Sequence, residues 1–149
     1  MDEKGFYFNN LNSSFTRKLY DLKDCFIEEY KKYSDNYEDH DEILNTLQTL
    51  EENMADNIGF RVALNAFKNW ELKNGGTKKL PLISFTNEQL FFMAYSQLFC
   101  DQIEYRLYEY EHSPSYVRLN AIAEHSKEFL EIFNCPINEK LKNKICSIL

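Results

Sequence analysis

The sequence is poor in glycine and proline, the two residues that tight turns between short strands most often need. It has 4 glycines and 3 prolines among 149 residues, against 12 phenylalanines and 10 tyrosines. This balance disfavours a β-sandwich and favours a helical domain. The length corresponds to one domain, and it is sufficient to bury a hydrophobic core.

Positive charge is also scarce, with 17 Lys and Arg against 24 Asp and Glu and a formal net charge of −7. A nucleic-acid or anionic-membrane surface needs clustered Lys and Arg, so we expect no nucleic-acid binding and no direct membrane contact. No window approaches about 18 uninterrupted apolar residues, and the first residues do not join a basic segment to an apolar one. We therefore expect neither a transmembrane segment nor a signal peptide in this sequence.

The common local motifs of catalysis are missing as well. No two of the 3 histidines lie close enough to complete a local zinc motif. We find no Gly-x-Ser-x-Gly elbow, no phosphate-binding glycine-rich loop and no dinucleotide fingerprint. The cysteines, which lack C-x-x-C spacing, fit buried thiols in a cytosolic protein or disulfides in a secreted one. They are Cys25, Cys100, Cys135 and Cys146.

Helical periodicity, by contrast, runs through most of the chain. Ser13 or Ser14 is a suitable N-cap for a first helix, whose apolar residues recur at steps of three and four up to Tyr33. An acidic polar loop is expected over residues 34–41. A longer helix is then predicted from about Asp41 to about Asn74, where Gly75 and Gly76 provide a left-handed C-terminal cap.

The second half of the sequence predicts two further helices. Thr86 and Gln89 have the spacing of a capping box that opens a helix reaching Cys100. This helix is apolar nearly all round and is expected to be buried. Residues 101–119 are expected to form a turn or an irregular segment because Pro114 disfavours helix in the residue before it. A last helix, capped by Ser126, is predicted to follow.

Two acidic residues, Glu52 and Asp56, lie in a part of the long helix that otherwise has the pattern of a core. On a helix they share one face with the small residues Gly59 and Ala63. The opposite face is expected to be the apolar stripe of Leu47, Leu50, Met54, Ile58 and Val62. Such a pair can be a metal ligand with its orienting partner, an acid/base pair, or simply two surface acids.

The segment Glu52-Asn53-Met54-Ala55-Asp56-Asn57, followed by Gly59, resembles the Gly-Glu-Asn-Ile-Ala-Asp-Asn-Gly-Gly segment of the neprilysin and endothelin-converting-enzyme family of zinc metalloendopeptidases. The similarity keeps its order through Ala66-Phe67-Lys68-Asn69-Trp70, Asn74-Gly75, Gln89-Leu90-Phe91-Phe92, Gln97-Leu98-Phe99-Cys100, His112-Ser113-Pro114 with Arg118, Glu128-Phe129 and Phe133-Asn134-Cys135-Pro136. It is strong over residues 45–146 and weak over residues 1–44. The resemblance implies that residues 1–149 are one partial domain, the mainly α C-terminal portion of a gluzincin-type catalytic lobe, organised around one long central helix.

The resemblance also implies a role for four residues. Glu52 would be the third protein ligand of a catalytic zinc ion, and Asp56 would accept a hydrogen bond from a zinc-bound histidine. His112 would stabilise the oxyanion of the tetrahedral intermediate, and Arg118 would hold a carbonyl of the bound peptide. Zinc and its bound water would supply the nucleophile for hydrolysis of peptide substrates.

The family's His-Glu-x-x-His motif, which provides two zinc ligands and the general base, does not occur in this sequence. Because catalytic zinc needs three protein ligands, we predict no peptidase activity from this polypeptide alone. Glu51 and Ile58 also replace family glycines beside the ligand. The leading expectation is a fragment of a neprilysin-like metalloendopeptidase. The alternatives are a non-catalytic domain that binds a peptide or protein partner and a product without function.

The family pattern further implies where the cysteines pair. Cys25 would pair with Cys146, whereas Cys100 and Cys135 would pair with cysteines of an N-terminal region that this sequence does not include. By the same resemblance, the expected location is extracellular, as a secreted protein or the ectodomain of a type II membrane protein.

Overall fold

The computed structural model describes residues 13–35, 45–76, 78–100, 111–136 and 146. These residues form helices and connecting turns with no strand among them, which confirms the mainly α fold class. The elements are α1 (Ser13–Asp35), α2 (Leu50–Lys73), α3 (Asn87–Ser96), the 3₁₀ helix η1 (Gln97–Phe99), α4 (Ser115–His125) and α5 (Lys127–Ile132). None of the helices in this described part is long and apolar enough to cross a membrane.

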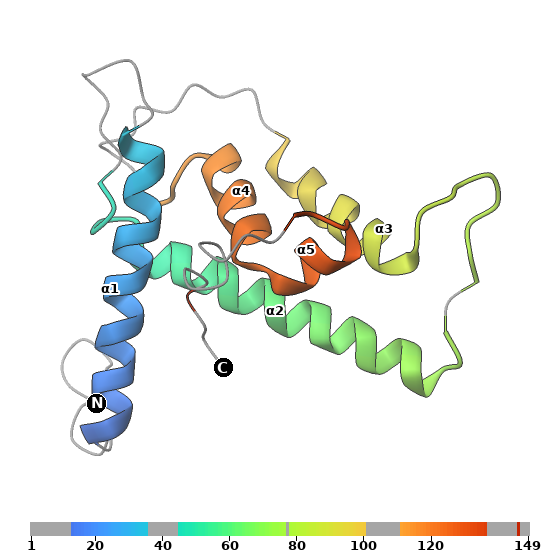
Figure 1. The fold of residues 1–149 in the computed structure, drawn as a ribbon, viewed down its shortest axis with the longest axis horizontal. Helices are drawn as coiled ribbons and strands as arrows, with labels where there is room; N and C mark the ends of the chain where they lie inside the picture. The colour runs from blue at the N-terminus through green and yellow to red at the C-terminus, as the bar shows by residue number, and fades with distance from the viewer. Residues whose placement is uncertain (1–12, 36–44, 77, 101–110, 137–145, 147–149) are drawn as a thin grey trace.

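Helix α2 runs along the length of the molecule and contacts both α1 and α4 (Figure 1). Helix α1 lies across the N-terminal part of α2, whereas α4, α5 and α3 lie along one side of it. Helix α5 follows α4 directly and also packs against α3.

The core consists of two groups of buried side chains, and α2 contributes to both. The first cluster is formed by Phe26, Tyr30, Leu50, Met54, Val117, Ala121 and Cys146. The second cluster is formed by Phe60, Leu64, Phe92 and Ile122. The first cluster therefore joins α1, α4 and the N-terminal half of α2, and the second joins the later part of α2 to α3 and α4.

Helix α2 begins at Leu50, so the predicted start near Asp41 was wrong. Residues 45–49 form a turn instead, in which the Asn45 side-chain oxygen accepts hydrogen bonds from the backbone N–H groups of Leu47 and Gln48, both at 3.2 Å. An asparagine that bonds its own neighbouring backbone offers the chain an alternative to the helix. Most of the predicted loop at 34–41, together with residues 42–44, lies outside the described residues.

The buried face of α2 also differs from the predicted stripe. Leu50 and Met54 are buried as expected, but Ile58 and Val62 are 38% and 60% exposed. Asn53 and Asn57 are buried instead, at 1% and 5% exposure. Asparagine is acceptable there because both amides are hydrogen bonded, as described below, so the cost of burying them is offset.

The capping box of Thr86 and Gln89 is present at the start of α3, which confirms that signal. The prediction of a fully buried helix to Cys100 was wrong. The α-helix ends at Ser96 and continues as η1, and Phe92 is the one buried residue in α3. Leu98 is 76% exposed. Apolar residues on all sides of a helix are covered only where neighbouring elements pack against every side, and the described elements do not cover Leu98.

Helix α4 is the main element that the sequence did not predict. Residues 101–110 lie outside the described residues, but Ser115 to His125 is helical where an irregular segment was expected through residue 119. Pro114 is the N-cap residue, so proline ends the preceding turn and opens the helix. The prediction extended the irregular segment past Pro114, whereas the residues after this proline are helical.

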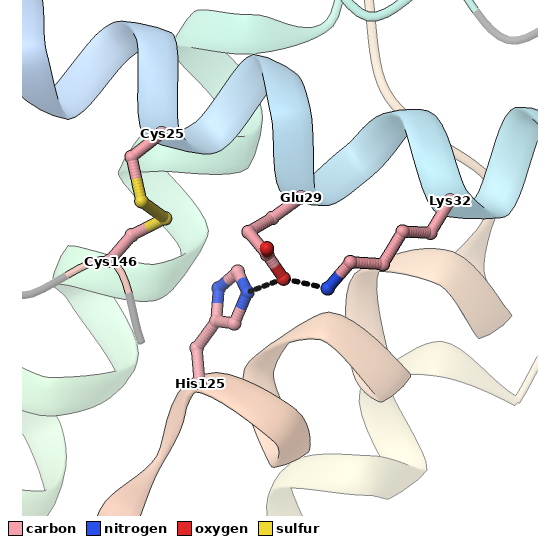
Figure 2. Close-up of a disulfide and its surroundings, with 5 residues drawn as sticks. All are labelled: Cys25, Glu29, Lys32, His125 and Cys146. Carbon is pink, nitrogen blue, oxygen red and sulfur yellow. Dashed lines mark hydrogen bonds and ion pairs between the residues drawn. A yellow bond between two sulfur atoms is a disulfide. The ribbon is translucent and has the colours of Figure 1, made fainter. Parts of the chain in front are cut away.

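Three other predictions were correct. Gly75 and Gly76 have φ angles of 74° and 81° after the end of α2. The Ser126 hydroxyl accepts a hydrogen bond from the backbone N–H of Phe129 at 3.1 Å and so caps α5. Cys25 and Cys146 form a disulfide (Figure 2), and Cys100 and Cys135 are free thiols.

Candidate functional site

The four residues singled out in the sequence meet beside the first half of α2. Glu52 and Asp56 stand one turn apart on that helix, His112 lies in the segment that leads into α4, and Arg118 lies in the first turn of α4. The Glu52 Oε2 atom lies 3.1 Å from the His112 Nε2 atom. The two side chains are 41% and 51% exposed, so this pair is open to solvent.

The second pair, Asp56 with Arg118, is more deeply placed. Arg118 donates through Nε to Asp56 Oδ2 at 2.5 Å and through Nη2 to Asp56 Oδ1 at 2.7 Å. The side chains are 15% and 22% exposed, and the guanidinium carbon lies 5.2 Å from the centre of the Phe99 ring. The hydrogen bonds to Asp56 raise the pKa of Arg118. A two-point pair of this kind fixes the orientation of the guanidinium plane and keeps it charged.

A buried hydrogen bond behind these pairs holds the His112 segment against α2. The Ser113 hydroxyl donates to the Asn53 side-chain oxygen at 2.8 Å, and Ser113 is 3% exposed. The Asn53 amide nitrogen in turn donates to the Thr49 hydroxyl at 3.0 Å. Because Asn53 follows Glu52 and Ser113 follows His112, this bond sets the distance between the two exposed side chains.

A second buried amide joins the same part of α2 to α1. The Asn57 amide nitrogen donates to the Tyr30 hydroxyl at 3.1 Å and to the backbone carbonyl of Asn53 at 2.8 Å. Burial raises the pKa of Tyr30, so this phenol stays neutral at physiological pH. The sequence analysis missed both asparagines. A usable signal was their spacing of four residues beside the acidic pair.

The small residues beside the acids are uncovered. Gly59 and Ala63 are exposed, and a Cβ atom built on Gly59 would meet nothing within 4 Å. The expectation that another element can approach α2 here is therefore sterically possible, but none of the described elements does so.

Comparison with known proteins identifies the family. The model of peptidase family M13 matches residues 1–147. Endothelin-converting enzyme 1 of guinea pig (Cavia porcellus) and of human are each 40% identical to the chain over 118 residues, or 76% of it. An endothelin-converting enzyme homolog of Locusta migratoria is 32% identical over 123 residues, or 78% of the chain.

The chain belongs to peptidase family M13. It spans only 15% of the length of the two mammalian enzymes and 16% of the locust protein. The family membership confirms the resemblance that the Glu52 segment indicated.

A zinc ion would need His, Cys, Asp or Glu ligands at this place. In the described part of the chain, no group of three or more His, Cys, Asp and Glu side chains is placed to hold a metal ion. Glu52 offers a partly exposed carboxylate with His112 as its neighbour, and Asp56 is occupied by Arg118. Since catalytic zinc takes three protein ligands, these residues do not fit zinc by themselves.

Proposed function

We propose that this chain is the C-terminal part of a neprilysin-like zinc metalloendopeptidase and supplies one side of its active site. The observation that carries the proposal is the convergence of Glu52, Asp56, His112 and Arg118 into two side-chain pairs on one part of α2. The two members of each pair lie 60 or more positions apart in the sequence, yet α2 and the start of α4 bring them together. Family membership gives the arrangement its chemical meaning.

In this proposal Glu52 is one protein ligand of the zinc ion, which in such peptidases activates water for attack on a peptide bond. Its partly exposed carboxylate is accessible for ligation, whereas the Asp56 carboxylate accepts hydrogen bonds from Arg118. Asp56 would then be the acid that orients a zinc-bound histidine, and in this chain it also orients Arg118. The chain alone lacks the further ligands, so it is expected to be inactive.

His112 and Arg118 would act on the substrate. His112 Nε2 is exposed on the Glu52 side and can donate to an oxygen that gains negative charge. Asp56 accepts from Nε and Nη2 of Arg118 and so orients the rest of the guanidinium group. The Nη1 donors of this fixed cation can then hold a carbonyl of the bound peptide.

The proposed location is extracellular, as a secreted protein or a membrane-anchored ectodomain. The disulfide between Cys25 and Cys146 supports this location, because such bonds persist in oxidising compartments. The proposed partners are peptide substrates, which would meet this surface only when the remainder of an M13 catalytic unit is present.

A second candidate function is a non-catalytic domain that binds a protein partner. The exposed apolar side chains of α2 favour it, since Ile58, Val62 and Trp70 are 38%, 60% and 51% exposed. Exposed apolar residues that follow one another along a helix are typical of a surface that another chain covers.

Zinc titration by calorimetry and a complementation assay test the two functions. The chain would be mixed with human endothelin-converting enzyme 1 from which the matching C-terminal region has been removed. We expect no tight zinc binding by the chain alone and peptide hydrolysis by the mixture. Glu52→Ala should abolish that hydrolysis. The matched control is Glu51→Ala, which removes the neighbouring exposed carboxylate, 3.5 Å from Lys23.

The outcomes separate the candidates. Stoichiometric zinc binding by the isolated chain that Glu52→Ala removes would contradict the prediction of an incomplete site. A stable complex with the truncated enzyme but no hydrolysis would favour the partner-binding domain. Equal loss of hydrolysis in the Glu51 and Glu52 variants would overturn the assignment of Glu52 as the ligand.

A further inference from the structure

A buried histidine lies at the contact between α1 and α4, away from the site described above (Figure 2). His125 is the last residue of α4 and its side chain is 7% exposed. Its ring meets the rings of Phe26 and Tyr30 on α1 edge-on, with centroids 5.7 and 6.3 Å apart. The histidine thus fills an aromatic position in the packing of α4 on α1.

The polar surroundings of His125 suit the neutral ring. Its Nε2 atom lies 3.7 Å from Glu29 Oε2, and the same carboxylate oxygen is bound by Lys32. Its Nδ1 atom is buried and has no hydrogen-bond partner among the described residues. A neutral imidazole needs a partner for one N–H, whereas a protonated ring presents two N–H donors and a charge. Protonation would therefore bury an unsatisfied donor, which is costly.

The charged groups around the ring act in opposite directions. Glu29 on α1 and Glu124 on α4 favour the protonated form, and Lys32 on α1 opposes it. The position at the C-terminus of α4 also favours a cation. Burial outweighs these attractions and lowers the pKa of His125. In the unfolded chain the same ring would titrate near its ordinary value of about 6.5.

Arg118 and His125 are seven residues apart on α4, which is two turns, so they lie on the same side of the helix. Contacts at the two positions tie α4 to different neighbours: Arg118 to Asp56 on α2, and His125 to Phe26, Tyr30 and Glu29 on α1. Loss of the α1 contact would free the C-terminal end of α4 and change the angle at which Arg118 meets Asp56.

We propose that His125 is a pH-sensitive contact, so that acidification protonates its ring, loosens α4 from α1 and disturbs the Arg118–Asp56 pair. The proton comes from solvent and is released again on return to neutral pH. The Cys25–Cys146 disulfide joins α1 to a residue of the first cluster. The switch itself does not depend on zinc or peptide. Only its effect on activity rests on the proposed function.

Because the pKa of His125 is lowered in the folded chain, acid should reduce the folding stability. Below about pH 6.5 the unfolded chain binds a proton that the folded chain resists, so unfolding takes up a proton and stability falls as the pH drops. The stability that the neutral His125 ring contributes is fully present above the pKa of this histidine in the unfolded chain, and it is progressively lost below that pKa. At most, one such group changes the unfolding equilibrium constant tenfold per pH unit.

The test is denaturant unfolding of the full chain between pH 7.5 and pH 5, together with an NMR titration of the His125 ring and of the Arg118 Nε–Hε signal. His125→Phe should keep the aromatic packing and remove most of the loss of stability with acid. Lys127→Gln is the matched control, since it removes an exposed cation two residues away that pairs with Glu131. It should leave the pH dependence unchanged.

We expect the wild-type Arg118 signal to change as His125 titrates, and to stay constant in His125→Phe over the same range. The proposal is overturned if the wild-type ring titrates at or above its ordinary value. An equally steep pH dependence in His125→Phe would also overturn it. The NMR titration needs no variant, so the proposal remains testable if His125→Phe fails to fold. Because neither measurement uses zinc or peptide, a negative result here leaves the metallopeptidase assignment intact.

Discussion

The two core clusters lie along the same helix, yet different forces hold them. The first contains the Cys25–Cys146 disulfide and borders the hydrogen-bonded amides of Asn53 and Asn57. The second consists of apolar side chains, with the Phe60 ring 5.0 Å from Phe92 and 4.7 Å from Tyr95. Hydrogen bonds and disulfides are directional and fix distances, whereas aromatic packing mainly removes apolar area from water.

The difference shows which part of the molecule fixes the positions of its side chains most closely. Both side-chain pairs of the candidate site lie on the half of α2 that the directional contacts hold. A buried hydrogen bond contributes only about 1 kcal/mol net to stability, whereas truncating a buried aromatic ring to alanine costs several times more. Apolar packing should therefore supply most of the non-covalent stability in both clusters, and the directional contacts at the first cluster should determine the geometry of the site.

The largest effect is expected from breaking the first cluster at its disulfide. Cys25 and Cys146 are 121 positions apart, so the bond closes a long loop in the unfolded chain. The chain-entropy estimate for such a loop is about 4 to 5 kcal/mol. Replacing both cysteines by alanine should lower the free energy of unfolding by that order, measured in urea. The control replaces Cys100 and Cys135, which are free thiols. Equal losses from the two double variants would show that the disulfide has no special role.

The second cluster is tested with Phe60→Ala. Phe60 is 2% exposed and contacts aromatic rings from α3, so its removal leaves a cavity that those rings cannot easily fill. We expect a loss of about 3 to 4 kcal/mol in the free energy of unfolding. Val62→Ala on the same helix is the control, because Val62 is 60% exposed and should change stability by less than about 0.5 kcal/mol. A Phe60 effect as small as the control would mean that the cluster is loosely packed.

The link between the first cluster and the site is tested with a double-mutant cycle on Asn53 and Ser113. Each single change to alanine leaves the partner's buried polar atom unpaired and should cost about 1 to 3 kcal/mol. The double variant should recover about 1 kcal/mol of the sum, because both atoms are then removed together. Asn53→Ala combined with Ser96→Ala, whose hydroxyl bonds the Met93 carbonyl, is the control and should be additive. Strict additivity for Asn53 and Ser113 would contradict the observed bond.

The local signals in the sequence were the most reliable, because each depends on residues that are close in the chain. Three such signals each span no more than four residues of the sequence, and all three are present in the structure. They are the capping box at Thr86, the glycines after α2 and the serine cap of α5. The disulfide and the family were predicted from a motif pattern instead. Long-range spacing of cysteines alone had left the pairing open.

The contacts that the sequence could not predict join distant segments. Asn53 and Ser113 are 60 positions apart, and Asn57 and Tyr30 are 27 apart. Periodicity placed Ile58 and Val62 inside and overlooked the asparagines, because it weighs residue type and not the partner that satisfies a buried amide. The pairing of Asp56 with Arg118 depends in the same way on α4, which the sequence analysis did not recognise.

The smallest effect is expected outside both clusters, in the loop between α2 and α3. Leu82 has a φ angle of 66° and is fully exposed, so it occupies the left-handed region without gaining any burial. That conformation costs a residue with a Cβ atom about 1 to 2 kcal/mol, and glycine avoids the cost but loses about 0.5 to 1 kcal/mol to backbone entropy. Leu82→Gly should therefore stabilise the chain by about 0.5 to 1 kcal/mol and raise the melting temperature by a few degrees. Leu80→Gly in the same loop should lower it, because Leu80 has no left-handed strain to relieve and the unfolded chain gains freedom. If both variants melt below the wild type, contacts of Leu82 offset its backbone strain. Specific contacts would then hold this loop, as they hold the first cluster.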